Sequence, residues 1–66
     1  MQIRLNGEPL EIEDDITVAA LVAARGLAPE QVAVEVNESL VARDRRSATK
    51  LSADDRVELV TLVGGG

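Results

Sequence analysis

Three consecutive glycines, Gly64-Gly65-Gly66, close the sequence directly after the strand-like run 57–63. Because glycine has no side chain, its backbone can enter a slot that is too narrow for any other residue. This pattern predicts that the terminal carboxylate of Gly66 is the working chemical group, and that Gly64 and Gly65 thread it into a partner's site. The alternative is an inert terminus, since chain ends are often poorly ordered without having a function.

Four acidic residues near the first third of the chain have the composition of a metal site: Glu11, Glu13, Asp14 and Asp15. Acids that precede a helix interact favourably with its dipole, and charges along a strand edge discourage aggregation. These two roles explain the group better than metal binding does, so we expect no metal site.

The sequence contains a single basic cluster, formed by Arg43, Arg45, Arg46 and Lys50. A solvated loop is the interpretation that we favour for it. Pairing with an acidic group of a partner is the alternative.

The chain of 66 residues lacks the side chains on which most enzymes depend, because it has no cysteine, histidine or tyrosine. It therefore offers no thiol nucleophile and no imidazole base. Hydrophobic residues make up 45% of the chain and none is aromatic, so a single small domain with an aliphatic core is expected. We expect a protein that is not itself an enzyme and binds no cofactor.

The charge balance points to protein partners. Seven basic residues against twelve acidic ones give a net charge of −5, which argues against binding to a phosphate backbone. No aromatic side chain is present to stack on bases. No apolar run reaches the roughly 18 residues of a membrane span, and no signal peptide is visible. We expect a cytoplasmic protein that binds neither nucleic acid nor membrane.

The first half of the chain predicts a hairpin followed by a helix. Residues 1–6 and 10–13 alternate in polarity around Asn6-Gly7, a strong signal for a two-residue hairpin turn. The alanine-rich segment 18–25 is typical of a helix, with Thr17 as its N-cap and Gly26 ending it.

The second half predicts three strands, 32–36, 39–42 and 57–63, with a turn at Asn37-Glu38 and a loop or helical turn over 44–50. Leu51 is expected to return to the core. One helix and five strands give an α+β roll in which the helix covers one face of the sheet. If Val57 and Leu59 face the helix, then Glu58, Val60 and Leu62 face outward, and the latter three are our candidate docking residues. The alternative is that Val60 is buried in a central strand.

This order of elements and its glycine ending resemble the ubiquitin-like sulfur carriers, most closely the ThiS family of thiazole synthesis in the thiamin pathway. The likeness covers nearly the whole chain, and no single piece of it is specific. The sequence departs from the family pattern at three places. The turn Asn37-Glu38 lacks an expected glycine, Ala42 stands where proline is common, and the segment after Arg43 lacks a frequent tryptophan. The segments that carry it are 1–7, Thr17-Val18-Ala19-Ala20-Leu21, 32–37, 40–43, 55–60 and 63–66.

The resemblance implies a ββαβββ β-grasp domain over residues 1–63, with the last strand beside the first, and a flexible glycine tail over residues 64–66. It also implies that an E1-like partner adenylates Gly66 with ATP, and that sulfur from a donor such as a cysteine desulfurase turns the carboxylate into a thiocarboxylate for thiazole synthase. The alternatives are a carrier of the molybdopterin synthase small-subunit type, a ubiquitin-like protein modifier, and an interaction domain with an inert tail.

Overall fold

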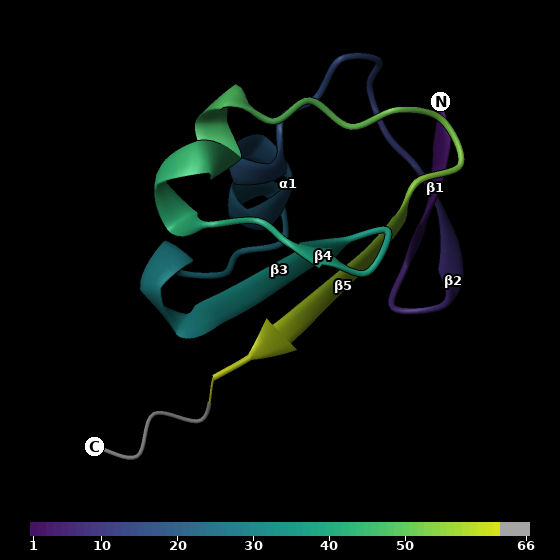
Figure 1. Ribbon diagram of the computed structural model, residues 1–66. Helices are drawn as coiled ribbons and strands as arrows, with labels where there is room; N and C mark the ends of the chain where they lie inside the picture. The colour runs from purple at the N-terminus through teal and green to yellow at the C-terminus, as the bar shows by residue number, and fades with distance from the viewer. Residues whose placement is uncertain (63–66) are drawn as a thin grey trace.

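In the computed structural model, which describes residues 1–62, a five-stranded mixed sheet carries one α-helix on one face (Figure 1). The strand order across the sheet is β2-β1-β5-β3-β4. Strands β1 and β5 run parallel, and every other neighbouring pair is antiparallel. The elements in chain order are β1 Gln2–Leu5, β2 Glu8–Glu11, α1 Val18–Ala24, the 3₁₀ helix η1 Pro29–Gln31, β3 Val32–Val36, β4 Ser39–Leu40, the 3₁₀ helix η2 Arg43–Ala48 and β5 Arg56–Thr61.

This arrangement confirms the predicted β-grasp order. The last strand, β5, lies between β1 and β3 in the middle of the sheet, as the resemblance implied. Among the described residues, no helix is both long enough and apolar enough to cross a bilayer.

Both hairpins turn through pairs of residues with positive φ. Asn6 and Gly7 have φ of 51° and 85°, and they connect β1 to β2 where Leu5 pairs with Glu8. Asn37 and Glu38, with φ of 51° and 73°, connect β3 to β4 in the same way although neither is glycine. Positive φ at both central residues is the geometry that fits the twist of a two-residue hairpin.

Helix α1 begins and ends with the predicted capping residues. The hydroxyl of Thr17 accepts a hydrogen bond from the Ala20 amide at 3.1 Å. At the other end Gly26 has a φ of +74°, and the Leu27 amide donates back to the Val22 carbonyl at 3.3 Å. This is the Schellman pattern, in which a glycine in the left-handed region lets the chain satisfy the last carbonyls of the helix.

The core lies between α1 and the inner face of the sheet. Helix α1 contributes its i, i+3, i+4 stripe, and Leu51, 3% exposed, joins it from the loop after η2, as predicted. The buried core residues are Ile3, Leu5, Val18, Leu21, Val22, Val32, Val34, Leu51 and Val57.

Several predicted boundaries were wrong by one to two residues. The fourth strand ends at Leu40 rather than residue 42, because Ala42 adopts φ −60° and ψ 146° and becomes the N-cap of η2. The loop or helical turn expected over 44–50 is this 3₁₀ helix, Arg43–Ala48. The second strand runs from Glu8 to Glu11 rather than 10–13, and the last runs from Arg56 to Thr61 rather than 57–63.

Candidate docking surface and glycine tail

The pairing of β3 with β5 decides which side chains face the helix and which face outward. Residues directly opposite each other in an antiparallel pair share a face of the sheet. Val36 pairs with Val57, which is 1% exposed and belongs to the core, whereas Ala33 pairs with Val60, which is 51% exposed. The prediction that Val60 faces outward is therefore confirmed, and the alternative of a buried Val60 is wrong.

Leu62 extends the same outward row past the end of β5. Its amide donates to the Gln31 carbonyl at 2.7 Å, so the pairing with the chain before β3 continues for one more residue. Its side chain is 48% exposed. Two large aliphatic side chains, Val60 and Leu62, thus lie on the uncovered face at the end of the chain from which the tail departs.

A third exposed aliphatic side chain on this face was not among the predicted docking residues. Leu40 is 70% exposed, and it pairs with Glu35, which in turn pairs with Glu58. This register puts Leu40 on the same face as Val60. No pattern within the two-residue strand β4 could reveal this, because only the register with β3 assigns its faces. We call Leu40, Val60, Leu62, Glu35 and Glu58 the sheet patch.

The sheet patch contains two like charges directly across from each other. Glu35 and Glu58 are paired in the β3–β5 register, an arrangement that destabilises a sheet. Within residues 1–62 neither carboxylate forms a salt bridge. A basic group from a partner would relieve this repulsion, so the pair adds a charge preference to an apolar surface.

The predicted tail residues Gly64, Gly65 and Gly66 lie outside the described residues, as does the final residue of the predicted domain, Val63. The boundary between a domain over 1–63 and a tail over 64–66 therefore stays a prediction.

Two of the four clustered acids bind the amino terminus. The Met1 ammonium donates to the Ile12 carbonyl at 2.8 Å and to Asp14 Oδ1 at 3.2 Å, and Glu11 lies at 3.7 Å. The hydrogen bond that the Met1 ammonium donates to Asp14 is the main reason why the pKa of this ammonium is raised above its usual value. The first turn of α1 itself contains no acid, and Asp14 and Asp15 precede the N-cap Thr17, so their expected role toward the helix dipole stays a prediction. Within the described part of the chain, no group of three or more potential ligands is placed to hold a metal ion.

The basic cluster is not uniformly solvated, and this part of the prediction was wrong for Arg46. Its side chain is 6% exposed and donates from Nη1 to the Pro29 carbonyl at 2.9 Å and from Nη2 to the Val32 carbonyl at 2.6 Å. Arg43, Arg45 and Lys50 are exposed, as expected.

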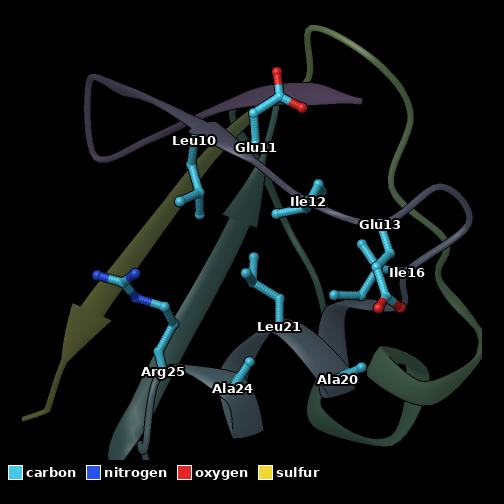
Figure 2. A pocket seen from close by; sticks show the side chains of 9 residues that line it. All are labelled: Leu10, Glu11, Ile12, Glu13, Ile16, Ala20, Leu21, Ala24 and Arg25. Carbon is cyan, nitrogen blue, oxygen red and sulfur yellow. The ribbon is translucent and has the colours of Figure 1, made fainter.

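A groove that sequence analysis did not anticipate lies between β2 and α1, on the helix side of the sheet (Figure 2). Its volume is about 630 Å³. Aliphatic side chains such as Leu10, Ile12 and Leu21 line it, Glu11 and Glu13 lie along β2 and the loop after it, and Arg25 extends from the end of the helix. It lies on the opposite side of the sheet from the sheet patch and contains neither a thiol nor an imidazole.

Comparison with known proteins identifies the family. The model of the ThiS family matches residues 3–66. The chain belongs to the ThiS family. The crystal structure of a thiamine biosynthesis protein, ThiS, from Geobacter metallireducens superimposes with a TM-score of 0.86 at 32% identity, covering 100% of both chains.

Two relatives that this chain resembles differ greatly in length. A thiazole synthase of Magnetococcus marinus is 46% identical over 66 residues, which are 100% of this chain and 20% of that protein. The uncharacterized protein ycf40 of Porphyra purpurea is 30% identical over 66 residues and is matched over 93% of its length. This chain therefore spans about a fifth of its thiazole synthase relative and nearly all of its short one.

These findings confirm the fold and the family that the resemblance indicated. ThiS-family proteins are sulfur carriers of thiamine biosynthesis, and this chain is a member of that family.

Proposed function

We propose that this protein is a cosubstrate that carries sulfur to thiazole formation in thiamin biosynthesis. The single observation that supports it most is the ThiS-family match over residues 3–66, which includes the three glycines as well as the folded domain. The protein provides the carboxylate of Gly66, and partner enzymes provide the catalytic groups that its composition lacks.

The chemistry at Gly66 needs an activation step, because resonance and negative charge make a carboxylate a poor acyl electrophile. In the proposed route, a carboxylate oxygen attacks the α-phosphorus of ATP in an E1-like enzyme and pyrophosphate leaves. A persulfide sulfur of the donor then attacks the carbonyl carbon and AMP leaves. A thiol cleaves the resulting acyl disulfide, and the sulfur stays on Gly66 as a thiocarboxylate.

The reach of the tail agrees with this role. Gly66 is the fourth residue after Leu62, and four residues of extended chain span at most about 14 Å. Ordering each residue of the tail costs about 1–2 kcal/mol, so the partner must offset several kcal/mol by contacts elsewhere. The sheet patch, which lies beside the point where the tail begins, is the surface that we propose for those contacts.

Thiazole synthase is the partner that we propose to accept the sulfur. A segment 46% identical to this chain occurs within a longer thiazole synthase of Magnetococcus marinus. Because a segment similar to this chain is joined to a thiazole synthase in this relative, we infer that the separate chains bind each other. An arrangement with the sheet patch against the partner keeps the tail directed at it.

The deciding experiment is intact-mass analysis after incubation with an E1-like enzyme, ATP and a sulfur donor. We expect the mass to rise by the difference between one sulfur and one oxygen atom. A chain without Gly65 and Gly66 is the matched control and should stay unchanged. High-mass conjugates would indicate a protein modifier instead, and an unchanged mass would overturn the proposal. The same analysis on protein isolated from cells checks that its chain ends at Gly66.

A further inference from the structure

The buried arginine of η2 is only partly satisfied within the fold. Arg46 is 6% exposed, and its two hydrogen bonds go to the carbonyls of Pro29 and Val32. Within the described residues its Nε–H has no hydrogen-bond partner, and no carboxylate lies within salt-bridge distance of the side chain. A buried positive charge is costly unless an opposite charge or a full set of acceptors compensates it.

A second arginine lies on the same face of η2. Residues three apart are eclipsed in a 3₁₀ helix, so Arg43 and Arg46 project on one side. Both line a pocket of about 210 Å³ whose other walls are Ala19 and Val22 of α1 and Pro29 of η1. Two arginine side chains therefore line one pocket, which brings two positive charges to the same part of the fold.

We propose that this pocket binds a carboxylate group carried on a short apolar stem. The carboxylate would contact Arg43 and the part of Arg46 that lines the pocket, forming charge-assisted hydrogen bonds and compensating both charges. The stem would pack against the aliphatic walls formed by Ala19, Val22 and Pro29. The apolar walls and the net charge of −5 favour such a monoanion over phosphate, which would carry more charge and no apolar surface.

The site is separate from the proposed sulfur chemistry, because η2 packs against α1 on the helix side of the sheet and the sheet patch is on the other face. The carboxylate could belong to a small metabolite or to an acidic side chain of a partner protein. Both sources present the same chemistry to the two arginines.

Titration followed by ¹⁵N NMR tests the proposal, with butyrate as the free carboxylate and sodium chloride at equal ionic strength as the reference. We expect saturable shifts of the Arg46 Nε–H signal and of the Ala19 and Val22 amides. Arg43→Gln, a change at an exposed residue, should weaken butyrate binding about tenfold, the loss expected for a hydrogen bond to a charged group. Arg45→Gln removes the same charge from a residue that does not line the pocket and should leave binding unchanged.

Further arms identify the source of the carboxylate. The peptide acetyl-Ala-Glu-Ala-amide presents a side-chain carboxylate on a short stem. Tighter binding of this peptide than of butyrate would support a partner's acidic residue, and the reverse would support a free metabolite. Equal weakening by the two arginine changes would mean non-specific screening and overturn the proposal. The proposal would also be overturned if inorganic phosphate bound as tightly as butyrate. The absence of any saturable shift would overturn it too, and the role of Arg46 would then be limited to its hydrogen bonds from η2 to Pro29 and Val32.

Discussion

Replacing Val60 by aspartate separates docking from folding in the sheet patch. Val60 is 51% exposed, and the residue directly opposite it on β3 is the small Ala33. The fold therefore has little packing to lose at this position. If the sheet patch is the docking surface, the same side chain becomes fully buried when a partner binds. The substitution should therefore affect association much more than stability.

The expected magnitudes follow from this difference in burial. Losing the strand preference of valine costs the fold about 1 kcal/mol, which lowers the melting temperature by about 4–8 °C in a domain of this size. Placing a carboxylate in the centre of an apolar contact, beside the acids Glu35 and Glu58, costs about 2 kcal/mol or more of binding energy. That loss weakens the complex with the E1-like enzyme about 30-fold or more.

Urea denaturation and calorimetric titration against the E1-like enzyme measure the two effects separately. Thr61→Asp is the matched control, because it adds the same charge at the next residue of β5, which is exposed on the other face of the sheet. We expect Thr61→Asp to bind nearly as well as the parent protein. A loss of stability above about 3 kcal/mol for Val60→Asp, the size expected for burying an unpaired charge, would contradict the surface assignment. Unchanged binding, or equal weakening by both variants, would refute the docking role.

Three further predictions address the tail, a turn and the amino terminus. Deleting Gly65 and Gly66 should leave the melting temperature unchanged and abolish ATP–pyrophosphate exchange by the E1-like enzyme; an unaltered exchange rate would contradict the role of the tail. Glu38→Gly should stabilise the fold by about 1 kcal/mol, because Glu38 has a φ of 73° and glycine tolerates that conformation without strain, and no gain in urea denaturation would contradict this. Since the Met1 ammonium has a raised pKa in the folded protein, its stabilising effect is complete below its usual pKa of 8.0 and disappears as the pH rises through the raised value. Urea denaturation across the alkaline range should show this loss of stability, and Asp14→Asn should remove most of it; an equal slope in both proteins would show that another group is responsible.

Local signals in the sequence predicted most of the fold correctly. Asn6-Gly7, the Thr17 cap and Gly26 are residues whose own conformational preferences define a turn or a helix end, so they could be recognised without any tertiary information. The alternation around Val57 and Val60 likewise identified which side of β5 faces the helix. The central position of β5 came from the family resemblance, because strand order depends on contacts between distant segments.

The features that were missed depend on tertiary contacts. Leu40 joins the sheet patch only through the register of β4 with β3, and Arg46 is buried only because η2 folds back against η1 and β3. In the sequence Arg46 is one of four neighbouring basic residues and nothing distinguishes it from Arg45. The end of β4 was predicted wrongly because the chain leaves the sheet before Ala42, which is the N-cap of η2. No glycine, proline or asparagine at this point of the sequence indicates the turn.

The parallel pairing of β1 with β5 joins the first strand of this sheet along the chain to its fifth. Until residues 56–61 leave the ribosome, the nascent chain holds two hairpins with no strand between them, and their inner apolar side chains lack their central neighbour. Such long-range pairing slows folding and leaves the unfinished chain vulnerable to aggregation. The same topology links β5, the strand that precedes the glycines, to the rest of the sheet. Strand β5 takes its central position only when both β1 and β3 are in place. A damaged or truncated chain would thus fail to form the sheet patch, and with it the docking surface that we propose.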